Sequence, residues 1–147
     1  MKATELLAAC RLLGNIYADF AAPICKKYGI NQTCFDLIMF CANNPGHNTA
    51  RDACELRGIK SGMASVAADT LIVKGLMTRC DDPLDRRLRR LVPTDAAAPL
   101  ISDGHKIQKE FASTLTDGIP EDELAAAKRT AAKIAANINA IVKGETQ

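Results

Sequence analysis

The segment 58–94 limits the fold of this 147-residue chain more than any other part. It places alanine and leucine at helical spacing up to Gly75, which predicts a helix that ends there. Two segments with strand character follow on either side of a loop rich in aspartate and arginine. In chain order these are the strand 76–80, the loop 81–87 with the sequence DDPLDRR, and the strand 88–92. A short helix followed by a β-hairpin is therefore predicted.

Another short helix is predicted directly before this one. Thr49 can cap its start, and Gly58 closes it after Leu56. Two short helices joined by a tight turn that contains glycine are typical of a helix-turn-helix. The second helix favours close packing on the first through its apolar positions, which are Ala64, Ala67, Ala68, Leu71 and Ile72.

The opposite face of the second helix is predicted to be exposed and available to DNA. Serine and lysine there can reach phosphates and base edges. Arginine, asparagine and glutamine do not occur on this face, so direct reading of bases is expected to be modest. The candidate DNA-contacting residues of this face are Lys60, Ser61, Gly62, Met63 and Ser65. Asp69 is expected to be exposed on the same face.

Positive charge is concentrated in the middle of the chain. The overall net charge of +2 divides into +1 for residues 1–42, +3 for 43–94 and −2 for 95–147. A cationic middle segment suits a polyanionic partner. An arginine that projects from the hairpin tip suits the narrow minor groove of DNA, and Asp85 would fix the loop if it pairs with an arginine. Four arginines lie within five residues at the hairpin, namely Arg86, Arg87, Arg89 and Arg90. The candidate DNA-contacting arginines are Arg79, Arg86, Arg87 and Arg89.

Both ends of the chain are predicted to form long amphipathic helices. Apolar residues follow one seam in 3–28 and another from Leu124 to Ile141, in alternating steps of three and four. Two such seams exceed what one small winged domain needs to bury. We expect a helical dimerisation lobe built from residues 1–30 and 95–147, beside a winged helix-turn-helix lobe of residues 31–94. The alternative is a three-helix core within one monomer.

Several classes of protein are disfavoured by composition and spacing. Aromatic residues make up 4% of the chain and tryptophan is absent, which argues against stacking platforms for single-stranded nucleic acid. The six cysteines include no C-x-x-C pair, and only two histidines occur, so neither a metal site nor a catalytic centre is predicted. No cofactor is expected, and the cysteines are interpreted as buried small hydrophobes. No apolar run is long enough to span a membrane, so we expect a soluble cytoplasmic protein.

The order of elements resembles the MarR family of bacterial transcription regulators. The most specific likeness is Asp85-x-Arg87, which matches the D-x-R signature of that family's wing, supported by 71–79 with the sequence LIVKGLMTR and by 92–94 with VPT. Pro93 and Ala97 depart from the leucine and glycine usual in the family. The overall expectation is a mainly α fold with a small β-hairpin wing.

The resemblance implies a homodimer that binds double-stranded DNA at a pseudo-palindromic operator and represses transcription. The helix 61–73 would enter the major groove, and Arg87, held by Asp85, would reach the minor groove. Release would follow binding of a small phenolic or other aromatic effector, or oxidation of a cysteine. Candidate effector contacts are Arg11, Tyr17 and Tyr28, and the candidate redox residue is Cys10. The alternative is a winged-helix protein-interaction module without specific DNA binding.

Overall fold

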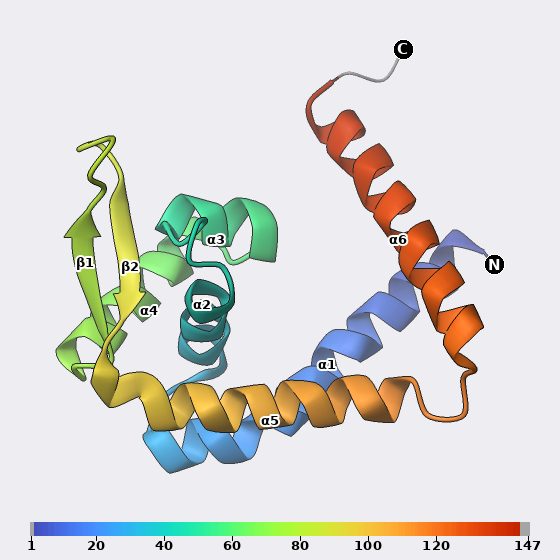
Figure 1. Cartoon of the computed structure of the whole chain (residues 1–147), viewed down its shortest axis with the longest axis horizontal. Helices are drawn as coiled ribbons and strands as arrows, with labels where there is room; N and C mark the ends of the chain where they lie inside the picture. Colours follow the sequence, from blue (N-terminus) through green and yellow to red (C-terminus); the bar gives the residue numbers. More distant parts are fainter. Residues whose placement is uncertain (1, 145–147) are drawn as a thin grey trace. The chain divides into compact units, whose positions relative to one another are not determined.

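The computed structural model describes residues 2–144 and contains six α-helices and one two-stranded sheet in these residues (Figure 1). The mainly α fold with a hairpin wing is confirmed. The elements are α1 (Ala3–Tyr28), α2 (Gln32–Asn43), α3 (Ala50–Arg57), α4 (Ser61–Val73), β1 (Met77–Asp81), β2 (Arg89–Pro93), the short 3₁₀ helix η1 (Asp95–Ala97), α5 (Ala98–Leu115) and α6 (Glu121–Val142).

Two compact units make up the chain. The first, Met1–Phe111, contains α1 to α4, the hairpin and most of α5. The second, Ala112–Gln147, contains the end of α5 and all of α6. The division into a dimerisation lobe and a DNA-binding lobe stays a prediction.

Local capping chemistry fixes the starts of the helices around the predicted helix-turn-helix. The Asn31 side chain accepts a hydrogen bond from the backbone N–H of Cys34 at 2.9 Å and so caps α2. Thr49 Oγ1 accepts from the Asp52 N–H at 3.0 Å, and the Asp52 carboxylate accepts from the Thr49 N–H at 3.0 Å. This reciprocal capping box begins α3 at the predicted position. Gly58, with φ 75°, ends α3 in the left-handed conformation.

The core of the first unit is centred on α2. Seven of its twelve residues are buried, so it is enclosed by neighbours on several sides. The helix α4 packs on it through Ala64, Ala67 and Ala68, whose small side chains allow close approach. Met77 and Leu91 of the hairpin and Leu100 of α5 complete the core. The predicted buried face of α4 is confirmed, and its outer face is left exposed.

The hairpin forms an antiparallel ladder in which Met77 pairs with Pro93 and Asp81 with Arg89. Both strands begin and end one residue later than the sequence suggested. Leu76 donates its N–H to Leu71 O and so belongs to the turn that closes α4. Leu88 donates its N–H to Asp85 O and so still belongs to the loop. Turn hydrogen bonds, and not side-chain alternation, therefore set the strand ends.

The terminal helices leave much apolar surface uncovered in the single chain. In α1 the first half of the seam is exposed, including Leu6 and Leu13, whereas Ala21 and Ile24 are buried. No residue of α6 is buried within the described chain, and Ile138 is 54% exposed. The helix α5 begins at Ala98 after η1, so that Pro99 lies in its first turn, where a proline is tolerated. Among residues 2–144, no helix has both the length and the apolarity needed to cross a membrane.

Candidate nucleic-acid interface

The outer face of α4 carries the residues predicted to contact DNA. Burial of Ala64, Ala67, Ala68 and Leu71 fixes the rotation of the helix about its axis. The side of α4 turned away from that core is consequently accessible. The exposed residues at its start are Lys60, Ser61, Gly62, Met63 and Ser65. The structure thus brings these five predicted residues onto one accessible segment.

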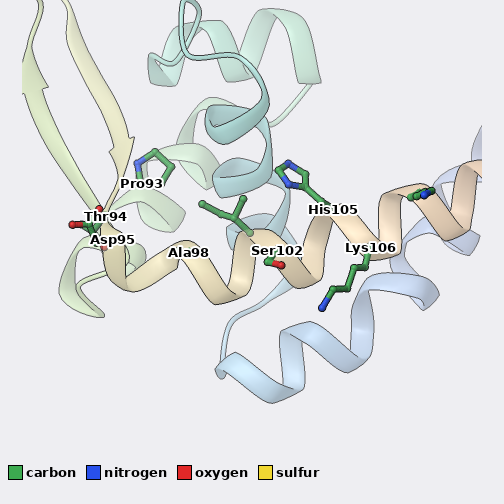
Figure 2. Close-up of a pocket in the computed structure, with 9 residues that line it drawn as sticks. Pro93, Thr94, Asp95, Ala98, Ser102, His105 and Lys106 are labelled. Carbon is green, nitrogen blue, oxygen red and sulfur yellow. The ribbon is translucent and has the colours of Figure 1, made fainter.

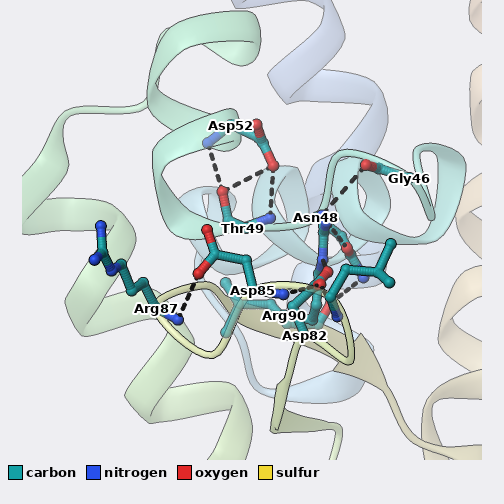
Figure 3. A network of polar contacts seen from close by, with 10 residues as sticks. Gly46, Asn48, Thr49, Asp52, Asp82, Asp85, Arg87 and Arg90 are labelled. Atoms are coloured by element: carbon teal, nitrogen blue, oxygen red, sulfur yellow. Dashed lines mark hydrogen bonds and ion pairs between the residues drawn. The ribbon is translucent and has the colours of Figure 1, made fainter.

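The wing loop is shaped by two aspartates (Figure 3). Asp82 Oδ1 accepts hydrogen bonds from the backbone N–H groups of Leu84 at 2.8 Å and Asp85 at 2.9 Å. Asp85 Oδ1 accepts from the backbone N–H of Arg87 at 3.0 Å. Such side-chain to main-chain bonds replace the missing ladder contacts of a tight loop. Asp85 therefore positions Arg87 through a hydrogen bond to its main chain. The sequence had instead suggested an ion pair between Asp85 and an arginine side chain.

Arg90 anchors the base of the wing to the rest of the first unit. Its Nε donates to Asp82 Oδ2 at 2.7 Å, and one terminal nitrogen donates to Gly46 O at 3.2 Å and to Asn48 Oδ1 at 3.3 Å (Figure 3). Asn48 in turn makes two hydrogen bonds with the main chain of Leu91: its side-chain amide donates to Leu91 O, and its backbone carbonyl accepts from the Leu91 N–H. The hydrogen bond from Arg90 holds the pKa of the Asp82 carboxyl below its usual range. We call Asp82, Arg90 and Asn48 the wing anchor.

The arginines of the hairpin divide into paired and unpaired groups. Arg79 forms an ion pair with Asp69 of α4 at 2.6 Å, and Arg89 pairs with Asp81 across the strands at 3.3 Å. The side chains of Arg86 and Arg87 are exposed at the loop and form no ion pair with the described residues. Among the arginines of the hairpin, these two are the most available to a polyanion.

Sequence reasoning did not assign roles to Asp82 and Asn48, and it did not separate Arg90 from its neighbours. One local signal was present: an aspartate followed by proline and a polar loop is typical of a side-chain-capped turn. Asn48 gave no such signal, because its partner Leu91 lies 43 residues away.

A groove of about 290 Å³ on α1 brings together two residues predicted for sensing. Cys10 and Tyr17 line it with Arg57 of α3. The guanidinium of Arg57 lies 5.9 Å from the centre of the Tyr17 ring and 3.2 Å from the Asp36 carboxylate. Gln108 donates to the Tyr17 hydroxyl at 3.0 Å, but burial dominates and raises the pKa of Tyr17. The remaining lining residues are Leu13, Gly14 and Phe111.

The other two predicted effector contacts are not part of this groove. Arg11 is exposed on α1 and does not line it. The Tyr28 hydroxyl donates to Asp103 of α5 at 2.9 Å, beside the Lys27–Asp103 ion pair of 2.7 Å. Tyr28 thus joins the C-terminal end of α1 to α5.

A second and larger hollow of about 600 Å³ lies along α5 where the wing joins it (Figure 2). Pro93, Thr94 and Asp95 form one end, and Ser102, His105 and Lys106 lie along the helix. His105 Nε2 is 2.7 Å from Asn43 Oδ1, and so this imidazole is already bonded within the fold. Within residues 2–144, no group of three or more His, Cys, Asp or Glu is placed to hold a metal ion.

The interpretation of all six cysteines as buried hydrophobes is wrong for part of the set. All six are free thiols, but only Cys34 and Cys41 are buried. Burial raises the pKa of Cys41 to about 12. Cys80 is exposed on β1, and Cys10 is exposed at the edge of the groove on α1.

The fold and the exposed helix beside a hairpin define a winged helix-turn-helix protein. Residues 28–88 match the sequence model described as the MarR family. This segment, which includes the helix-turn-helix and the wing loop, is therefore of MarR type, and the resemblance inferred from Asp85-x-Arg87 is confirmed. No curated protein is significantly similar in sequence.

Solved structures share the fold over almost the whole chain. A MarR transcriptional regulator from Methanosarcina mazei Go1 superposes with a TM-score of 0.79 at 18% identity, covering 96% of this chain and 94% of that one. CouR from Rhodococcus jostii RHA1, bound to p-coumaroyl-CoA, gives 0.70 at 18% identity and coverages of 85% and 87%. MepR of S. aureus, in a complex with DNA, gives 0.56 at 18% identity and coverages of 87% and 96%. The chain has the fold of MarR-type transcriptional regulators.

Proposed function

We propose that this protein is a sequence-specific DNA-binding regulator that represses transcription. The observation that carries the proposal is an accessible α4 beside a wing whose Arg86 and Arg87 form no ion pair with any residue of 2–144. The helix would enter the major groove while Arg87 reaches the adjacent minor groove. MepR, which shares the fold, is known in a complex with DNA, and this supports the proposal.

The proposed active form is a homodimer on a pseudo-palindromic operator. The exposed apolar residues of α1 and α6 support this form, because a seam such as Ile134, Ile138 and Ile141 is costly to leave in water. Two-fold symmetry would place the two copies of α4 at a fixed separation, near one helical turn of DNA. Residues 1–30 and 95–147 would supply the dimerisation lobe.

Release from DNA is proposed to follow binding of a small aromatic effector or oxidation of Cys10. CouR, with the same fold, binds p-coumaroyl-CoA, an aromatic ligand. In the present chain the groove beside Cys10 offers the Tyr17 ring and the Arg57 guanidinium, which suit an aromatic anion. Occupation of the groove would act on α3, the first helix of the helix-turn-helix, through Arg57.

A mobility-shift titration of the Arg87→Ala variant over a range of salt concentrations tests the wing. An operator is first selected from random duplexes with the full chain. The variant should bind this operator more weakly and with a salt slope smaller by about 1, because one cationic contact to the DNA is lost. Its thermal unfolding should not change, since the Arg87 side chain is exposed.

Arg129→Ala is the matched control for charge. Arg129 is exposed, and the helical spacing places it away from the apolar seam of α6. This variant should bind like the unaltered protein. Equal affinity and equal salt slope for Arg87→Ala would refute the wing assignment. Failure of the selection to enrich any sequence at moderate salt would refute DNA reading and favour the protein-interaction module.

A further inference from the structure

The accessible face of α4 is apolar at the positions that project furthest from the core. The exposed fraction is 51% for Met63, 65% for Val66 and 88% for Val73. The residues on the opposite side of the helix, Ala64 and Leu71 among them, are fully buried. The core contacts of α4 are therefore made by other residues, and Met63 and Val66 do not contribute to them. An exposed apolar surface of this kind suits a binding partner.

The polar side chains beside these residues are already bonded within the protein. Thr70 Oγ1 donates to Val66 O at 2.9 Å, one turn earlier in the same helix. Asp69 is paired with Arg79 of β1 at 2.6 Å, which offsets its negative charge. What remains on this face for hydrogen bonding to DNA is the hydroxyls of Ser61 and Ser65 and the ammonium group of Lys60. Apolar contact is consequently the main means by which α4 can distinguish one base from another.

Val66 lies between two shallow hollows on the surface of the first unit. One, of about 500 Å³, extends from Val66 to Asn31 and Thr33 at the start of α2. The other, of about 440 Å³, extends from Val66 toward Val73. The Val66 side chain thus forms a ridge between the two hollows, and a partner of complementary shape can contact it from both sides.

Cations flank this apolar ridge. Lys60 precedes α4 and lines the first hollow, and Lys74 follows α4 and lines the second. An apolar strip bounded by positive charge at both ends is complementary to the major groove, whose edges are phosphates. The only apolar group that a base presents in that groove is the C5-methyl of thymine.

We infer that Val66 and Met63 contact thymine methyl groups, so that α4 selects thymine in each half-site of the operator. The inference rests on the proposed function and names the chemistry that α4 reads. Gly62, which adds no side chain between Ser61 and Met63, leaves open space at the start of the helix and allows the backbone to approach the DNA.

Replacing thymine by deoxyuridine tests this inference directly, because it removes only the methyl group. The operator selected with the full chain is synthesised with deoxyuridine at the thymines of each half-site and compared with the unaltered duplex by mobility shift. Affinity should fall about fourfold for each methyl contact that is lost. Deoxyuridine at thymines outside the half-sites serves as the DNA control and should have no effect.

Two matched variants test whether the loss of affinity caused by deoxyuridine comes from the Val66 side chain. Val66→Thr keeps the shape of the side chain but replaces a methyl by a hydroxyl, and it should remove most of the penalty caused by deoxyuridine. Val142→Thr makes the same change at the C-terminal end of α6, outside the apolar face of α4. It should retain the full penalty. Both residues are exposed, so neither change should unfold the chain.

The outcomes separate this inference from the proposed function. Equal, salt-dependent binding of the thymine and deoxyuridine operators would overturn thymine reading and leave DNA binding in place. An unchanged penalty in Val66→Thr would overturn the role of Val66. If selection enriches no sequence, the proposed function itself fails, and the apolar face of α4 is then a surface for a protein partner.

Discussion

Among the glycines, Gly104 in the middle of α5 is the one where an added methyl group meets the closest neighbouring atoms. A Cβ there would lie 2.8 Å from Cε of Met39, and closer still to its sulfur. Met39 is 1% exposed in α2, so it has little room to move aside. The substitution Gly104→Ala therefore forces α5 and α2 apart or drives Met39 out of its preferred conformation.

The expected loss follows from two opposing effects. Overpacking a core typically costs about 1–3 kcal/mol. Alanine favours a helix over glycine by up to about 1 kcal/mol. The net loss for Gly104→Ala is thus about 0–3 kcal/mol. Gly62→Ala is the control, because it is also helical but has no atom within 4 Å of an added Cβ. It should gain up to about 1 kcal/mol, leaving a difference of about 1–3 kcal/mol between the two variants.

Urea unfolding at one fixed protomer concentration measures this difference, since dimerisation would make stability depend on concentration. A Met39→Ala background provides a second check. The shorter side chain leaves room for the added methyl, so Gly104→Ala should be less destabilising there than in the native background. The close packing of α5 on α2 would be refuted if Gly104→Ala proved at least as stable as Gly62→Ala and if its effect on stability were the same in the Met39→Ala background.

Three further predictions concern the wing, α4 and the cysteines. The pKa of Asp82 is lowered in the folded state, so the stability that this carboxylate contributes is present above the ordinary carboxyl pKa of about 3.9 and is lost as the pH falls below that value. Thermal unfolding measured between about pH 6 and 3 should show this loss of stability, and the loss should be smaller in Asp82→Asn. Gly62→Ala should weaken operator binding at least about fivefold in mobility shift without lowering the unfolding temperature, because the methyl stands between α4 and the DNA; unchanged affinity would contradict close approach there. Alkylation at about pH 8 followed by mass spectrometry should modify exposed Cys80 in the folded protein but Cys41, with a pKa of about 12, only after unfolding; labelling of both at equal rates would contradict the burial of Cys41.

The elements that sequence predicted well are those with local causes. The bounds of α4 follow from its alanine spacing and from Gly75, and the start of α3 follows from the Thr49 capping box. All the residues that determine these features lie within one or two helical turns of each other. The ends of the hairpin strands were shifted by one residue, because single turn hydrogen bonds at Leu76 and Leu88 decide them.

The wing anchor illustrates what the sequence alone could not provide. Four arginines between 86 and 90 look equivalent in the sequence, but strand register turns only Arg90 toward Asp82 and Asn48. The same limit applies to the groove beside Cys10, where Arg57 arrives from a helix 47 residues further along the chain. Contacts of such long range depend on how the elements pack, which spacing along the chain does not reveal.

The wing anchor also has a consequence for how a regulator of this kind would tolerate different DNA sequences. Arg90 joins the hairpin to Gly46 and Asn48, directly before α3, and the Arg79–Asp69 ion pair joins β1 to α4, so the wing and the helix-turn-helix are tied into one body at two points. On the proposed function, this body cannot widen or narrow to follow the duplex. The DNA must then change its groove width to fit, at an elastic cost that varies with its base steps. Base pairs that touch no side chain would thereby contribute to operator choice through their stiffness.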